Sequence, residues 1–103
     1  MKKTFGQDSY SNIITSLVNS AVTHTEGVSA DEVFLTKSKR SSNVNLYFDE
    51  NSISVDVYID VIFGYNVSQV ACALQEKIIG DITENTGLDV KNVNIIVNGV
   101  IFN

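Results

Sequence analysis

Histidine and cysteine are nearly absent from this sequence, which has one of each among its 103 residues. A single cysteine, Cys72, cannot cross-link the chain to itself, so the fold does not depend on a disulfide within the chain. His24 has no second imidazole with which to hold a metal ion, and the sequence offers it no acid–base partner. We interpret His24 as a surface residue near a helix end and Cys72 as a small, partly buried helix residue.

Long apolar runs and an excess of positive charge are absent as well. No segment approaches the roughly 20 apolar residues that span a bilayer, and the lysines at the N-terminus precede no apolar segment that would make a secretory signal. Seven basic residues against twelve acidic ones give a net charge of −5. This balance disfavours a general nucleic-acid binder and direct adsorption to an anionic membrane. We therefore expect a cytoplasmic protein that reaches a membrane only through a partner protein.

The apolar content is sufficient for a folded core. Apolar residues make up 44% of the chain, which is ordinary for a globular protein and argues against disorder. A length of 103 residues accommodates one domain with one hydrophobic core. We therefore predict a single domain over residues 1–103.

The clearest local pattern is an alternating strand over residues 53–63. Side chains alternate across a strand, so a period of two sustained over this length indicates one buried face and one exposed face. The residues expected to point inward are Ile53, Val55, Val57, Ile59, Val61 and Phe63. Those expected to point outward are Ser54, Asp56, Tyr58, Asp60 and Ile62. Gly64 ends the strand.

A helix is predicted directly after this strand, over residues 67–85. Asn66 is placed as its N-cap and Gly87 closes it, while Tyr65 and Val70 are spaced as a hydrophobic staple across the cap. The apolar stripe of this helix consists of Val67, Val70, Ala71, Leu74, Ile78 and Ile82, with Ile79 beside it.

An earlier helix is predicted from a cap at Asp8 or Ser9 to a stop at Gly27, after a loose lead-in at residues 1–7. Its apolar stripe consists of Tyr10, Ile13, Ile14, Leu17, Val18, Ala21 and Val22. The many Ser, Asn, Thr and β-branched residues are weak helix formers, so we expect this helix to depend on docking against a sheet.

The remaining strands are predicted at residues 44–49 and 90–102, and residues 33–36 are compatible with an extra short strand. The short link at residues 50–52 predicts a hairpin between 44–49 and the long strand. The order helix, strand, strand, helix, strand indicates an α+β fold. We expect two layers, with two helices on one face of a small mixed three-stranded sheet.

The sheet face opposite the helices is the candidate functional surface. Its candidate interaction residues are Tyr47, Asp56, Tyr58, Asp60, Ile62, Ile96, Val100 and Phe102. Aromatic and polar residues are mixed in this way at protein interfaces, although scattered apolar surface residues are also normal. Asp56 and Asp60 are about 13 Å apart at about 3.3 Å per strand residue, too far to share a metal ion. We therefore predict no metal, no cofactor and no catalytic residue, so that the protein is not an enzyme.

A polar loop supplies an alternative site. Lys37, Lys39 and Arg40 are three of the seven basic residues and lie within four positions of one another. They suit a small ligand- or nucleic-acid-binding module, although short charge runs usually just face water. The net negative charge makes nucleic acid the less favoured partner.

An ordered set of motifs connects the chain to a known family. The motifs are Glu26-Gly27-Val28, the alternating strand at 55–59, Gly64-Tyr65-Asn66, the helix at 70–78, the segment 86–90 and the strand at 93–97. Together they resemble the alkaline shock protein family of Gram-positive bacteria, the envelope-stress or YloU-like proteins. The resemblance covers roughly residues 10–102.

The resemblance implies a non-enzymatic cytosolic protein linked to the homeostasis of the cell envelope. Some relatives self-associate and are held at the membrane by a separate anchor protein. The expected partners are therefore a second copy of the chain, a membrane-anchor protein, or both. The family supplies no catalytic residues to transfer, so the interaction residues named above come from the strand pattern alone.

Overall fold

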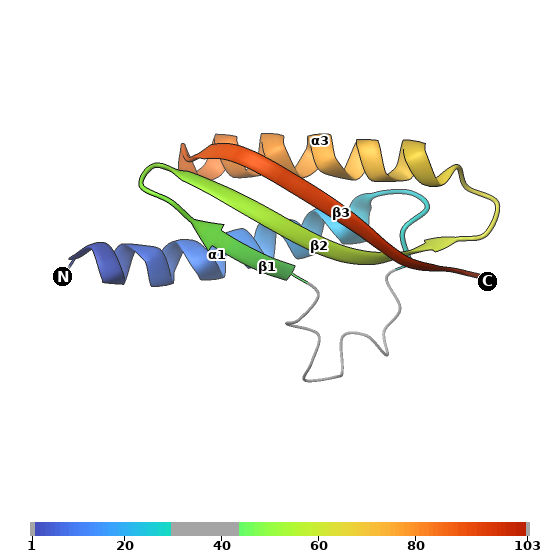
Figure 1. Cartoon of the computed structure of the whole chain (residues 1–103), viewed down its shortest axis with the longest axis horizontal. Helices are drawn as coiled ribbons and strands as arrows, with labels where there is room; N and C mark the ends of the chain where they lie inside the picture. Colours follow the sequence, from blue (N-terminus) through green and yellow to red (C-terminus); the bar gives the residue numbers. More distant parts are fainter. Residues whose placement is uncertain (1, 30–43, 103) are drawn as a thin grey trace.

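A computed structural model describes residues 2–29 and 44–102, with side chains from Tyr10 onward (Figure 1). The elements in chain order are α1 (Lys2–His24), β1 (Val44–Phe48), β2 (Ser52–Ile62), α3 (Val67–Thr86) and β3 (Asp89–Ile101). This is the predicted order, and the α+β class is confirmed. The short strand expected at residues 33–36 lies outside the described residues.

The three strands form one mixed sheet in the order β1-β2-β3. β1 and β2 pair antiparallel as the predicted hairpin, with Val44 opposite Val57 and Phe48 opposite Ile53. β2 and β3 pair parallel, so α3 is the crossover between them. Figure 1 shows α1 and α3 on the same side of the sheet, which confirms the two-layer arrangement. β2 is therefore the central strand, and its outward side chains lie in the middle of the face opposite the two described helices.

The core lies between the helices and the inner face of β2. Every inward residue of β2 from Ile53 to Val61 is buried, whereas the outward ones are only half-buried, as the alternation predicts. The prediction for Phe63 is wrong, because its side chain is 61% exposed. The strand ends at Ile62, and the Phe63 ring stacks on the Phe102 ring.

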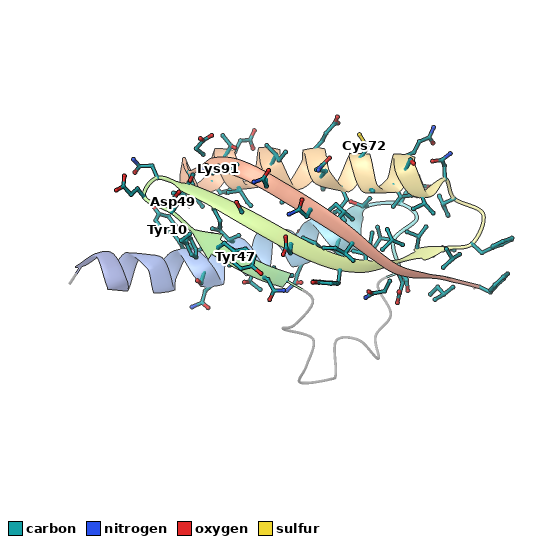
Figure 2. The ribbon with its side chains drawn as sticks, in the orientation of Figure 1. Tyr10, Tyr47, Asp49, Cys72 and Lys91 are labelled. Atoms are coloured by element: carbon teal, nitrogen blue, oxygen red, sulfur yellow. The ribbon has the colours of Figure 1, made fainter. Side chains whose placement is uncertain are left out.

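Helix α3 begins and ends where its caps specify. The Asn66 side chain accepts a hydrogen bond from the Gln69 backbone N–H at 3.0 Å. Gly87 adopts a left-handed conformation, and its N–H donates to the Thr83 carbonyl. The buried stripe is Val70, Leu74, Ile78 and Ile82. The expectation of a partly buried Cys72 is wrong, because its side chain is exposed and points away from the sheet (Figure 2).

Helix α1 begins at Lys2, so the predicted lead-in at residues 1–7 and the cap at Asp8 or Ser9 are wrong. No proline interrupts this segment, and one interior glycine costs only about 1 kcal/mol, so the helix continues toward the N-terminus. In the apolar stripe Ile14, Val18 and Ala21 are buried, while Ile13 lies outside it and is exposed. The helix ends at His24, before Gly27.

The turn after α1 attaches this helix to the end of β2. The Ile62 N–H donates to the Gly27 carbonyl at 2.8 Å, and the Ser29 N–H donates to the Asp60 carbonyl at 2.9 Å. Gly27 has φ +95°, and a Cβ there would lie 2.7 Å from Val70 Cγ2 and 3.0 Å from the Tyr65 ring. Tyr65 and Val70, the predicted hydrophobic staple, thus pack against Gly27 and leave no space there for a side chain.

Two register breaks alter the faces of β3. The second break makes Asn98 an extra residue, so Asp60 pairs with Gly99 and Val61 pairs with Val100. Val100 therefore shares the inner face with Val61, and Ile101 takes the outward position beside Ile62. The placement of Val100 on the outer face is wrong, because strict alternation across the whole of β3 does not allow for the bulge.

Candidate functional site

The outer sheet face is the side of the sheet opposite α1 and α3. Its outward positions are Asn45, Tyr47, Ser54, Asp56, Tyr58, Asp60, Ile62, Asn92, Asn94, Ile96 and Ile101. Neither of the two helices that the structure describes covers it (Figure 1). The face includes six of the eight candidate residues, adds Ile101, and omits Val100 and Phe102.

Two apolar cross-strand pairs lie along the middle of this face, with Asp60 and Gly99 between them. Tyr58 is registered beside Ile96, and Ile62 beside Ile101, across the parallel pair of β2 and β3. All four side chains are half-buried, and Tyr47 on β1 is 54% exposed (Figure 2). Cross-strand pairs of aromatic and β-branched side chains stabilise a sheet. The sheet thus combines apolar side chains from three strands.

Asp56 is held in a fixed orientation on this face. Asn94 Nδ2 donates to Asp56 Oδ1 at 2.9 Å across β2 and β3. Reduced hydration of the Tyr47 phenol, together with the nearby Asp56 carboxylate, raises the pKa of Tyr47 above its ordinary value. The carboxylate is therefore bracketed by an amide on one side and a phenol on the other.

Asp60 has a different surrounding. Its partner in the register is Gly99, and a Cβ at position 99 would lie 3.8 Å from Asp60 Oδ1. Because Gly99 carries no side chain, the space beside this carboxylate is not filled by β3. The one salt bridge in the described part of the chain lies elsewhere, so neither Asp56 nor Asp60 pairs with a described cation.

That salt bridge lies at the hairpin end of the sheet (Figure 2). Lys91 Nζ lies 3.4 Å from Asp49 Oδ2, and both side chains are exposed. The Glu50 backbone N–H and the Lys91 ammonium lower the pKa of Asp49 below its ordinary value. Ser52 and Asp89 help to line an open depression here. Across the described ranges, no three His, Cys, Asp or Glu side chains are grouped to hold a metal ion.

An exposed aromatic pair lies at the opposite end of the sheet. The rings of Phe63 and Phe102 stack with centroids 4.5 Å apart and planes at 21°. Phe102 is 74% exposed and lies beyond the last residue of β3, so its assignment to the outer sheet face is wrong. The sequence analysis missed this pair because it extended each strand alternation past the residue at which the strand ends.

The other residues singled out from the sequence form no site in the described structure. The exposed His24 places Nδ1 2.8 Å from the Ser20 carbonyl, one helical turn away. Cys72 Sγ approaches only Glu76 on the same helix, at 4.0 Å. The basic loop residues Lys37, Lys39 and Arg40 lie outside the described residues.

With this geometry established, comparison with known proteins identifies the family. The model of the alkaline shock protein 23 family, described as having a cell envelope-related function, matches residues 8–102. The chain belongs to this family, which confirms the resemblance inferred from its motifs. The uncharacterized protein YloU of Bacillus subtilis (strain 168) is 36% identical over 66 residues, which are 64% of this chain and 55% of YloU. The match thus spans about half the length of that curated relative.

Solved structures support the fold independently. Variants of the MamM CTD superpose with TM-scores of 0.55 and 0.53 at 13% and 12% identity. The first covers 88% of this chain and 96% of the MamM chain, and the second, a nickel form, covers 85% and 96%. At this identity the likeness concerns the fold alone. Neither helix within residues 2–29 and 44–102 combines the length and the apolar content that a membrane crossing requires.

Proposed function

We propose that this chain is a non-enzymatic interaction module of the cell envelope and that it docks a partner protein through the outer sheet face. The observation that carries the proposal is the two apolar cross-strand pairs, Tyr58 with Ile96 and Ile62 with Ile101, on a sheet face that neither described helix covers. A sheet normally buries its apolar side chains against a second layer. The partner supplies that layer.

The chemistry of the outer sheet face supports binding rather than catalysis. Its two carboxylates, Asp56 and Asp60, are about 13 Å apart on one strand, beyond the separation of a paired acid and base. Asp56 is already engaged by Asn94 and lies beside Tyr47. The proposal therefore assigns these residues to recognition and assigns no catalytic residue.

The family description supports a place for this module at the cell envelope. We propose that the protein reaches the membrane through its partner, either a membrane-anchor protein or an assembly of its own copies. An acidic protein is repelled by anionic lipid, so direct adsorption is the less favourable route.

The test is a double substitution in the first of the two apolar pairs, Tyr58→Glu with Ile96→Glu. These cross-strand neighbours place two charges at the centre of the outer sheet face. The matched control is Ser68→Glu with Ala73→Glu, which adds the same two charges on exposed positions of α3. Circular dichroism establishes that both variants fold.

Tagged wild-type protein and both variants are then used to isolate complexes from the native cell. We expect wild type and the α3 control to retain the same specific partner or self-assembly, and the outer-face variant to lose it. If the folded outer-face variant keeps its partners and hydrodynamic size, the proposal is wrong.

A further inference from the structure

We infer that the partner of the outer sheet face presents a cationic segment with Lys or Arg side chains that meet Asp56 and Asp60, and that it is a different protein from this chain. The inference rests on the proposed function, because it names the chemistry of the partner that this face docks. It selects between the two kinds of partner that the proposed function leaves open.

Charge complementarity carries the inference. The outer sheet face has two carboxylates and no described cation, since Lys91 is held by Asp49 at the sheet end and Lys77 lies on α3. A second copy docked face to face would bring four carboxylates into one interface. Four carboxylates that share one desolvated contact, with no described cation to neutralise them, disfavour association. A partner with Lys or Arg converts the same carboxylates into favourable contacts.

Asp56 is prepared for such a contact. The Asn94 amide fixes one of its oxygens at 2.9 Å, and the Tyr47 phenol lies nearby. A carboxylate with a fixed orientation loses less freedom when it binds a cation than one that rotates freely. Charge-assisted hydrogen bonds between Lys or Arg and carboxylates are also stronger than neutral ones.

The Asp60 carboxylate, for its part, can be reached by a side chain of the partner. Gly99 leaves open space beside its carboxylate, and the φ of Gly99 is not positive, so the backbone does not require glycine at this position. The two carboxylates are about 13 Å apart, which matches side chains four residues apart in an extended segment. Tyr58 lies between them on β2, where its ring can pack against the stems of the cationic side chains.

A peptide probe tests the charge requirement. The probe is an eight-residue peptide of alternating Lys and Thr, and its counterpart has Gln in place of Lys. Binding is followed by amide chemical shifts of the full chain at low and high ionic strength. We expect the Lys peptide to shift the amides around Asp56, Tyr58 and Asp60, to weaken with salt, and to bind at least about tenfold more tightly than the Gln peptide.

Two neutralising variants separate the site from the overall negative charge. Asp56→Asn with Asp60→Asn should weaken binding of the Lys peptide about tenfold, while Glu76→Gln with Glu84→Gln on α3 makes the same change in net charge and should leave binding nearly unchanged. Gly99→Ala, which places a methyl group beside Asp60, should weaken binding less than the double neutralisation. Equal losses in both double variants, or shifts confined to other surfaces, overturn the inference.

Sedimentation of the wild-type chain and of the Tyr58→Glu with Ile96→Glu variant tests whether a second copy of the chain occupies the outer sheet face. A wild-type oligomer that this variant abolishes identifies a second copy as the occupant, which overturns the inference and leaves the proposed function standing. If this variant leaves the native partner complex intact, the proposed function itself fails. A monomer whose Lys peptide binding depends on Asp56 and Asp60 supports the inference.

Discussion

Substitution of Gly27 by alanine tests how α1 is joined to the sheet. The Gly27 carbonyl accepts the Ile62 N–H, and Val28 forms a bridge with Val61, so this turn attaches α1 to the end of the central strand. Gly27 is buried and has φ +95°. An alanine there must either adopt a conformation that L-residues rarely adopt or change the turn.

Two costs add for Gly27→Ala. A positive φ costs an L-residue roughly 1–2 kcal/mol. The new methyl group would lie 2.7 Å from Val70 Cγ2 and 3.0 Å from the Tyr65 ring, and overpacking of this kind costs about 1–3 kcal/mol. We therefore expect a loss of about 2–5 kcal/mol, from a total of roughly 5–15 kcal/mol for a domain of this kind.

Gly80→Ala is the matched control. Gly80 lies in the interior of α3, and a Cβ there would meet no atom within 4 Å. Alanine should therefore stabilise the helix by roughly 0.5–1 kcal/mol, since glycine loses more freedom on folding. Urea denaturation followed by circular dichroism gives both free energies. If Gly27→Ala unfolds at the same urea concentration as wild type, the account of this turn is wrong.

Three further changes test other parts of the fold. Leu74→Asp puts a charge at a fully buried position of α3 and should unfold the domain. If the variant unfolds at the same temperature as wild type, the assignment of Leu74 to the buried stripe of α3 is wrong. Phe102→Ala removes the ring stacked on Phe63 and should lower the free energy of unfolding, measured by urea denaturation, by about 0.5–1.5 kcal/mol. An unchanged free energy of unfolding would refute the contact between these exposed rings. Because the pKa of Asp49 is lowered in the folded state, its carboxylate stabilises the fold at pH values above its ordinary pKa of 3.8. This stabilisation disappears as the pH falls through the lower pKa of the folded state. Wild type should therefore be more stable than Asp49→Asn at neutral pH, with the difference in melting temperature vanishing in acid.

Local chemistry was sufficient to predict β2 and α3. The inward residues of β2 through Val61 alternate without a break and are buried, because β2 is the central strand and the helices cover its whole inner face. Asn66 and Gly87 define the ends of α3 through backbone hydrogen bonds that depend only on neighbouring residues. The fold class followed from these patterns.

The errors occur where tertiary geometry overrides local pattern. The bulge at Asn98 moves Val100 to the inner face. Gly99 inside the strand is the signal for this bulge, and strict alternation ignores it. Phe63 continues the alternation of β2 but lies past the end of the strand, where it contacts Phe102 instead of the core. Both errors concern the end of the outer sheet face.

The candidate site could be predicted only as a set of outward residues. Strand periodicity placed Asp56, Tyr58 and Asp60 on one face, and the register of the sheet pairs them with Asn94, Ile96 and Gly99. The pairing itself depends on how β3 slides along β2, which periodicity does not fix. The orientation of Asp56 and the open space beside Asp60 therefore required the structure.

Photo-crosslinking from the centre of the outer sheet face tests the central claim most directly. Tyr58 is replaced by the photoreactive residue p-benzoylphenylalanine in the native cell, and Ala73 on the exposed side of α3 is replaced as the control. The account predicts a defined protein adduct from position 58, absent from position 73, whose formation decreases when Asp56 and Asp60 are both changed to Asn. Absence of an adduct from position 58, or the same adducts from both positions, would contradict it.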